Sequence, residues 1–480
     1  MASRAKPSGT PPAPPVVPLA EHWRDKHFYV VGQTGVGKSR FLEHLILQDV
    51  EQAKGAGVLD VAEDLFNHVL YHIAKLSLVK PEIVERIAII DPLDARWTVG
   101  INPLETAPGD IAHRRALSLT DAMVTIWDFK PNEAPRMTRL LNNSVMALAA
   151  AGLTLVYLRR FLREDAYRQQ VLSRIHEPQI AEYFLQEFPK SEAGQAQWVA
   201  PILNKIEPFL FDPDLRLIFE SGATINFRHL MDNHGILLVN LAKGRFTTYN
   251  SNLLGAFILS QIQQAAAARS NTTYRVPFYV YLDEFQNYTT GDIETILTES
   301  RRNKLCLTLA HQFVHQLPEI QREAILNNAG TIACFRVGYQ DAEILAHELF
   351  PALMTRWRAE ARMVHTRPLP TMVPDFVEET ITHAEKVSWI QKLAMREFLT
   401  KHRGERLPRK ARSLDMPDPQ WTPELIDAKQ RIIETAGRRY GRLKSEVRAA
   451  PIYVPNQPTA RPNYISSEDD DFYDPKAQAL

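Results

Sequence analysis

The sequence has little that would announce a compartment or a partner. Its 480 residues include two cysteines, Cys306 and Cys334, and each lies in a short apolar run. This predicts two buried thiols in a reducing compartment, because a zinc site needs more ligands at closer spacing. Lysine plus arginine and aspartate plus glutamate both number 56. The zero net charge excludes a globally basic chain, so any basic surface must be local.

Long apolar runs are also lacking. Residues 1–20 are rich in proline and contain no segment apolar enough for a secretory signal, so we expect them to be extended or disordered. The most apolar stretch, Val145–Leu158, is shorter than the roughly 20 residues that a membrane span needs, and it predicts a buried core helix. These features favour a cytoplasmic protein without a membrane span.

Apolar runs typical of strands alternate with helical patterns in two separate parts of the chain. They cover residues 27–31, 57–60 and 87–91 in the first part, and residues 236–241, 277–282, 305–309 and 331–337 in the second. Between the two parts, residues 110–230 show helical patterns. The alternation predicts an α/β fold with a mostly parallel sheet, interrupted by an all-helical insertion.

This pattern divides the chain into five predicted segments. They are a disordered N-terminus (1–22), the first part of a nucleotide-binding domain (23–104), the helical insertion (105–231), the second part of the domain (232–365), and a C-terminal region (366–480). The last is expected to be polar and irregular with short helices, one of them at 423–436, and an acidic, disordered tail around 466–474.

The firmest motif lies in FYVVGQTGVGKSRFLEHLI, residues 28–46. A strand-like run, a glycine-rich turn and a helical pattern follow one another, as a phosphate-binding P-loop requires. The predicted loop consists of Gly32, Gln33, Thr34, Gly35, Val36, Gly37, Lys38 and Ser39. Glycines let backbone N–H groups surround phosphate. We expect Lys38 to contact the β- and γ-phosphates of ATP and Ser39 to bind Mg²⁺.

A second motif, VYLDEFQNY, supplies acidic residues at the end of another apolar run. Asp283 is expected beside the Mg²⁺ ion, and Glu284 is expected to take a proton from the attacking water. Asp60 and Asp91 also end apolar runs, but only Asp283 has an adjacent glutamate. The pair therefore favours hydrolysis over transfer to a small substrate.

Three polar residues flank the strand predicted at 305–309. Gln312 follows this strand, where it could report the presence of the γ-phosphate. Arg301 and Arg302 end the preceding helix. They are either a solvated helix end or a source of an arginine finger for a neighbouring subunit.

Contacts to DNA are least visible in the sequence. Lys243 and Arg245 follow the strand at 236–241 on a predicted loop, which could also be an ordinary surface turn. Residues 392–412, in which basic residues outnumber acidic ones, are a second candidate or a solvated face.

Taken together, the motifs resemble those of the HerA–FtsK superfamily, and within it the type IV secretion coupling ATPases and their soluble relatives. The segments that carry the resemblance are Gly32–Ser39, VYLDEFQNY, TILTESRRNKLCLTLAHQF, ILNNAGTIACFRVGYQDAEILAHEL and, more weakly, GRRYGRLKSEV. The resemblance implies a RecA-like motor domain, a ring that is typically a hexamer, ATP sites between subunits, and DNA in a central channel. It assigns roles in ATP hydrolysis to Lys38, Ser39, Asp283, Glu284, Gln312 and one of Arg301 and Arg302.

The sequence thus predicts an ATP-driven, ring-forming DNA translocase, acting alone or recruited by a secretion or mobilisation partner. One alternative is a motor that feeds DNA to a partner nuclease in defence or plasmid processing. Another, from a different class, is a nucleotide-switched assembly platform with slow hydrolysis. Membrane-bound coupling proteins begin with transmembrane helices, whereas this sequence shows none, so we expect a free cytoplasmic motor or one that a partner protein recruits.

Overall fold

The computed structural model describes residues 23–105, 112–127, 134–221, 224–288, 293–350, 354–364, 367–376 and 382–449. The predicted disordered N-terminus and acidic tail lie outside these residues. The chain divides into two compact units. The first contains residues up to Leu45 and Cys306–Pro417, and the second contains Ile46–Leu305 and the chain from Asp418 onward. These units cut the chain differently from the five predicted segments, whose boundaries remain a prediction.

The first unit is built on five neighbouring strands in the order β12-β11-β8-β1-β7. Strand β1 (Phe28–Val31) pairs in parallel with β7 (Leu305–His311) and β8 (Thr331–Phe335), and it is buried along its whole length. Helix α1 (Lys38–Glu51) follows β1 and places Phe41 against three other aromatic rings, those of Phe28, Phe335 and Phe398. The predicted strand–turn–helix order is confirmed.

Strands β11 (Glu397–His402) and β12 (Arg409–Arg412) correct the prediction of an irregular C-terminal region. Strand β11 pairs antiparallel with β8 and β12, and Phe398 and Leu399 are buried. Most of the charged side chains face solvent, as expected for an edge of a sheet. The basic side chains of Lys401, Arg409 and Lys410 contact acceptors within the unit, Lys410 with Glu397 at 2.8 Å. These contacts make the basic segment 392–412 a weaker candidate for binding DNA.

The first unit contains further elements besides these strands. They are α13 (Glu319–Asn328), α14 (Tyr339–Leu349), α15 (His383–Gln391), and the antiparallel pair β9 (Met354–Val364) and β10 (Arg367–Phe376). Helix α15 begins with a complete capping box in which Thr382 and Glu385 exchange hydrogen bonds. The β9–β10 pair was not predicted.

The second unit contains four parallel strands in the order β6-β2-β5-β3. These are β2 (Gly55–Asp60), β3 (Ile87–Ile90), β5 (Ile236–Asn240) and β6 (Phe278–Leu282). Helices α2 (Asp64–Ser77), α11 (Thr248–Ala267) and α12 (Ile293–Glu299) connect or flank them. The near-continuous apolar composition of the strands follows from burial on both faces. With the first unit, this confirms the predicted α/β class.

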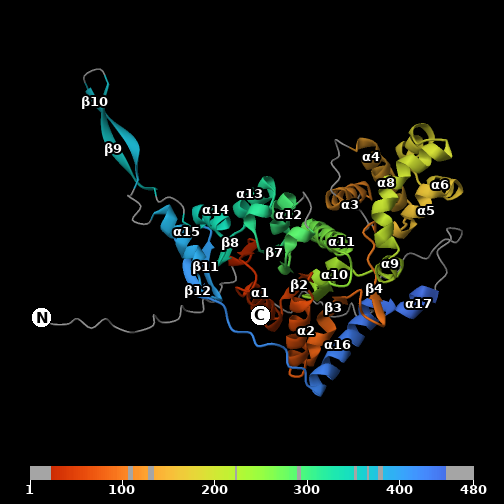
Figure 1. Ribbon diagram of the computed structural model, residues 1–480, viewed down its shortest axis with the longest axis horizontal. Coiled ribbons are helices and arrows are strands. Elements are labelled where there is room, and N and C mark those ends of the chain that lie inside the picture. Colours follow the sequence, from red (N-terminus) through yellow and green to blue (C-terminus); the bar gives the residue numbers. More distant parts are fainter. Residues whose placement is uncertain are drawn as a thin grey trace. The chain divides into compact units, whose positions relative to one another are not determined.

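The described residues between β4 (Trp97–Val99) and β5 form helices and no strand, apart from a single bridge between Gly100 and Thr224. The helices are α3 (Ala112–Ile126), α4 (Pro135–Ala150), α5 (Leu158–Arg163), α6 (Asp165–Leu172), α7 (Pro178–Glu182), α8 (Glu192–Leu210), α9 (Pro213–Glu220) and α10 (Phe227–Asp232). Figure 1 shows α3, α4, α5, α6 and α8 gathered in one cluster. The predicted all-helical insertion is confirmed.

The apolar stretch Val145–Leu158 is not one helix, contrary to the prediction. Helix α4 ends at Ala150, and Gly152 adopts a left-handed φ of 67°. The N–H of Leu153 then bonds back to the carbonyl of Leu148 at 2.9 Å, which closes the helix end. Both sides of this turn are buried, so the expectation of core residues holds.

The C-terminal part of the second unit consists of α16 (Pro423–Tyr440), β13 (Gly441–Leu443) and α17 (Lys444–Ala449). Strand β13 pairs with β4, and α16 begins at the position predicted for a helix.

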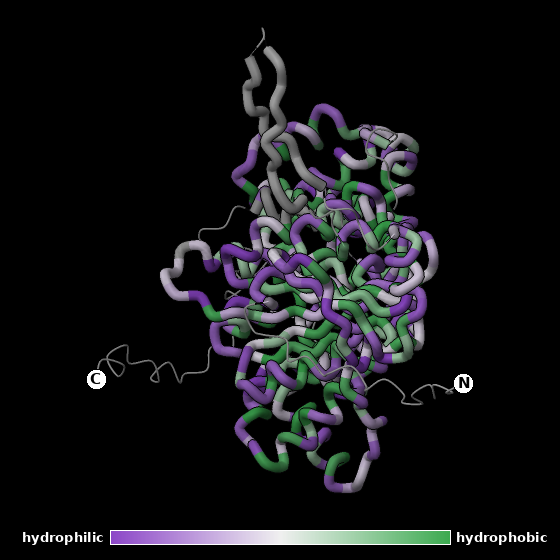
Figure 2. Tube along the Cα trace, turned by 90° about the vertical axis from the view of Figure 1, so that its left-hand side faces the viewer, coloured by the Kyte–Doolittle hydropathy of each residue, from purple (hydrophilic) through white to green (hydrophobic). Residues whose placement is uncertain are grey.

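Figure 2 shows hydrophobic segments in the interior and hydrophilic ones toward the outside. Among the residues that the structure describes, no helix is both long and apolar enough to span a bilayer.

Candidate nucleotide-binding site

The P-loop lies in the first unit, between β1 and α1. Gly37 has a φ of 105°, which a residue with a side chain rarely adopts. A Cβ atom on Gly32 would lie 2.6 Å from Cβ of Phe335, so this position also requires glycine because β8 packs directly against it. The loop geometry therefore depends on the glycines that the motif supplies.

Lys38 is the first residue of α1 and is 6% exposed. Its Nζ atom donates to the carbonyl of Gly32 at 2.5 Å and to that of Gln33 at 3.4 Å. The ammonium group is thus held at the loop, while Ser39 is exposed in the first helical turn. A cation at a loop followed by a helix N-terminus is the arrangement that binds phosphate oxygens.

Gln312 lies beside this loop. Its Oε1 atom accepts a hydrogen bond of 3.0 Å from Oγ1 of Thr34, and the N–H of Gly32 donates to the carbonyl of the preceding residue, His311, at 3.2 Å. The parallel pairing of β1 with β7 brings about this proximity. A contact between the P-loop and Gln312 gives a physical route by which that residue could respond to a bound phosphate.

His311 was not predicted from the sequence. Its side chain is fully buried, and Nδ1 lies 3.3 Å from the hydroxyl of Tyr29. Burial lowers the pKa of His311 to about 4, with smaller contributions from the positive charges of Lys38 and His315. The imidazole is therefore neutral at pH 7 and adds no positive charge next to Lys38.

The Asp283–Glu284 pair lies in the second unit, directly after β6. Asp283 is 5% exposed, and its N–H bonds to the carbonyl of Leu59 at 3.2 Å, one step beyond the pairing of β6 with β2. The buried hydroxyl of Tyr288 donates to the Asp283 carbonyl at 3.0 Å. These contacts hold the aspartate at the carboxyl end of a parallel sheet, where α/β folds place their ligands.

Glu284 adopts a left-handed φ of 47°, which is uncommon for a residue with a side chain. Its N–H donates to Oδ1 of Asp283 at 3.1 Å, and its Oε2 accepts from Nε2 of Gln286 at 2.8 Å. Strained backbone of this kind persists only where its surroundings hold it, and it is concentrated at functional sites. The carboxylate is thus oriented by its own neighbours.

Comparison with solved structures finds this fold in the plasmid coupling protein TrwB. The unbound bacterial conjugative coupling protein TrwBdeltaN70 aligns with a TM-score of 0.58 at 15% identity, over 88% of this chain and 92% of that chain. TrwB in complex with ADP and Mg²⁺ aligns with a TM-score of 0.56 at 13% identity, over the same shares. The chain has the fold of a conjugative coupling protein. No family model matches the sequence, and a search of curated proteins finds no match.

The coupling-protein fold agrees with the RecA-like fold that the motif resemblance implies. TrwB in complex with the non-hydrolysable ATP analogue ADPNP gives a lower TM-score, 0.53 at 13% identity, over 86% of this chain and 92% of that chain. At these identities the likeness concerns the fold, and the roles of individual residues rest on the chain's own geometry.

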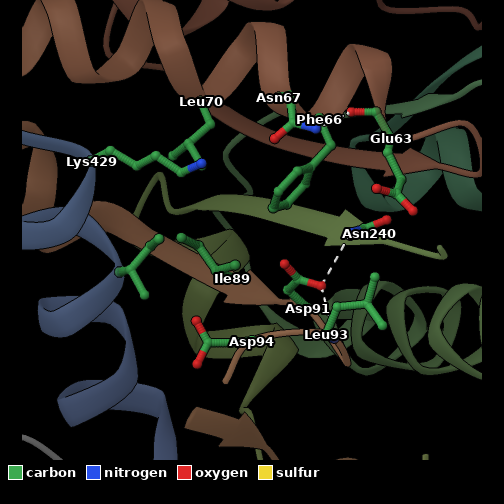
Figure 3. A pocket seen from close by; sticks show the side chains of 11 residues that line it. Glu63, Phe66, Asn67, Leu70, Ile89, Asp91, Leu93, Asp94, Asn240 and Lys429 are labelled. Atoms are coloured by element: carbon green, nitrogen blue, oxygen red, sulfur yellow. Dashed lines mark hydrogen bonds between the residues drawn. The ribbon is translucent and has the colours of Figure 1, made fainter. Parts of the chain in front are cut away.

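The other aspartates considered as metal ligands are already bound by protein groups. Both carboxylate oxygens of the buried Asp60 accept backbone N–H groups, from Ala62 at 2.9 Å and from Phe66, in the first turn of α2, at 2.8 Å. Asp91 accepts from Asn240 at 3.1 Å and lines a pocket of about 190 Å³ that α2 and α16 flank (Figure 3). Burial raises the pKa of both aspartates.

The remaining predicted residues lie on the surface of the second unit. Arg301 and Arg302 are exposed in the 3₁₀ turn Ser300–Asn303, and Arg245 is exposed in the loop after β5. Lys243 of that loop donates to Oδ1 of Asn287 at 3.2 Å. Sequence reasoning found these residues but gave no sign that Lys243 contacts the segment after Glu284.

Proposed function

We propose that this chain is an ATP-hydrolysing, ring-forming DNA translocase of the HerA–FtsK and conjugative coupling type. The observation that supports it most is the P-loop with Lys38 held at its carbonyls, on a fold shared with a coupling protein whose solved complexes contain ADP with Mg²⁺. The likeness shows the fold, so nucleotide turnover, the ring and DNA movement are inferences from the site chemistry and the motifs.

Lys38 and the P-loop N–H groups bind the β- and γ-phosphates in this proposal. Ser39 and Asp283 would hold Mg²⁺, which supplies charge neutralisation at the phosphates when it is bound. The residues fit such a group, because a carboxylate and a hydroxyl are the oxygen ligands that Mg²⁺ prefers. Glu284 accepts the proton of the attacking water, and Gln312 senses the γ-phosphate through its contact with Thr34.

An arginine from a neighbouring subunit, Arg301 or Arg302, completes the site in a ring, and the exposure of both side chains supports this role. Lys243 and Arg245 contact DNA in the central channel. Ring symmetry multiplies a few cations per subunit, so this assignment is compatible with a net charge of zero.

The deciding experiment measures ATP hydrolysis by the purified full chain with and without DNA. A translocase hydrolyses ATP faster when single- or double-stranded DNA is added, and Lys38→Ala abolishes both rates. Slow hydrolysis that DNA does not change, together with nucleotide-dependent assembly, would instead identify an assembly platform. Mass measurement of the particle with ATP and DNA decides whether a ring forms.

A further inference from the structure

The turn that precedes β11 touches the P-loop, although about 360 residues separate the two in the sequence. The N–H of Arg396 donates to the carbonyl of Val36 at 2.9 Å. A Cβ atom on Gly37 would lie 3.3 Å from Cγ and 3.6 Å from Cα of Arg396. Arg396 and the P-loop belong to the first unit, so this arginine packs directly against the loop.

The backbone of Arg396 is held in an unusual conformation at this contact. Its φ is 68°, and its carbonyl accepts the N–H of Ser413 at 2.9 Å. A left-handed arginine is strained, and such residues are maintained where the surrounding structure fixes them and the position is used. The two backbone hydrogen bonds hold the arginine against the loop regardless of where its side chain points.

The guanidinium group of Arg396 forms an ion pair with an exposed carboxylate, that of Asp415. It pairs with Asp415 at 2.7 Å, and the side chains are 25% and 73% exposed, respectively. Ion pairs with such an exposed carboxylate contribute little stability. A phosphate group can accept two hydrogen bonds from the planar guanidinium and carries more negative charge than a carboxylate, so it can replace the aspartate.

We propose that Arg396 is a nucleotide-binding residue that contacts the phosphates of the nucleoside triphosphate from within the same subunit. In this proposal, Asp415 holds the guanidinium beside the loop until nucleotide binds. The inference rests on the proposed function, because it requires that the P-loop binds nucleotide. Arg396 would thus add one cation to the P-loop residues, and this cation comes from the segment directly before β11.

The test measures the affinity of the full chain for a fluorescent ATP analogue with Mg²⁺, and the thermal midpoint without nucleotide. Arg396→Gly retains the backbone N–H and the left-handed conformation but removes the guanidinium. We expect about ten- to hundredfold weaker binding, as for loss of one charge-assisted hydrogen bond, with an unchanged or raised midpoint. Arg396→Lys should bind with intermediate affinity, and Asp415→Asn should bind as tightly as the wild type or more so.

Ala53→Gly is the matched control for the backbone, since Ala53 is also left-handed, with a φ of 59°, and lies just beyond the far end of α1. It should raise the midpoint without changing affinity. Affinity of Arg396→Gly within twofold of the wild type would overturn the inference. A second result would also overturn it: a lower thermal midpoint in Arg396→Gly together with an affinity loss in Arg396→Lys as large as that in Arg396→Gly. That pattern indicates a purely structural role for Arg396. If the wild type itself binds no nucleotide, the proposed function fails first, and this inference fails with it.

Discussion

Nζ of Lys243 donates a hydrogen bond of 3.2 Å to Oδ1 of Asn287, and the amide of Asn287 donates to the carbonyl of Glu284 at 2.8 Å. The loop after β5 is therefore linked through one side chain to the strained residue proposed as the catalytic base. If DNA binds Lys243, its effect can reach the backbone of Glu284 through these two hydrogen bonds.

This link predicts that DNA binding and DNA stimulation can be separated. Lys243→Met should weaken DNA binding, lower the salt slope of binding by about 1, and reduce stimulation of ATP hydrolysis. Asn287→Ala should reduce stimulation while leaving DNA affinity near that of the wild type. Arg245→Ala, which changes the same loop without touching Asn287, should weaken DNA binding only. Equal stimulation in Asn287→Ala and the wild type would contradict the link.

A second prediction separates nucleotide binding from turnover. Lys38→Ala should abolish binding of ATP, because the β- and γ-phosphates lose their main cation. Glu284→Gln should bind ATP normally but hydrolyse it about a hundredfold or more slowly, since an amide of nearly the same shape cannot accept the proton of water. Single-turnover hydrolysis and equilibrium binding measure the two effects. A normal rate in Glu284→Gln would show that another group is the base.

The sequence predicted these residues because each is marked locally. A glycine-rich turn between a strand and a helix, and an acidic pair after an apolar run, are visible without tertiary structure. Arg396 has no such mark, because its role arises from contact between segments about 360 residues apart. The strands β11 and β12 were missed since their exposed faces are highly charged, and α4 was predicted too long since its neighbours across Gly152 are equally apolar.

A third prediction concerns pH. Burial lowers the pKa of His311 to about 4 in the folded chain, below the value near 6.5 expected in the unfolded chain. The unfolded state therefore binds more protons between these values, and stability falls as the pH drops from about 6.5 toward 4. The loss attributable to this residue is ~2 kcal/mol at pH 5. Urea unfolding at pH 7 and pH 5 should show a smaller decrease for His311→Gln than for the wild type, and an equal decrease would exclude this origin.

A fourth prediction concerns Gly437, the first residue of the weaker motif near the C-terminus, GRRYGRLKSEV. A Cβ atom on Gly437 of α16 would lie 2.3 Å from the Trp97 ring of β4. Gly437→Ala should therefore lower the free energy of unfolding by ~1–3 kcal/mol, even though alanine favours helix. Gly244→Ala, at a site with no atom within 4 Å of the added carbon, should change it by less than about 0.5 kcal/mol. Denaturant unfolding of both variants measures the difference, and equal values would show that α16 moves freely away from β4.

The last prediction concerns the ring. Negative charge on the γ-phosphate is spread over three oxygens as the bond to the β-phosphate breaks. A cation supplied by a neighbouring subunit neutralises this charge and accelerates hydrolysis by roughly a thousandfold or more. Arg301 and Arg302 are exposed at the end of a short turn and are free of the backbone constraints of a strand. Alanine at the residue that acts as the finger should preserve ATP binding and abolish hydrolysis, whereas alanine at the other is the matched control. Mixing the inactive arginine variant with Lys38→Ala should restore part of the activity, because one subunit then offers an intact pocket and the other an intact arginine. Mixed rings that form, as mass measurement shows, but remain inactive would mean that the arginine acts within its own subunit.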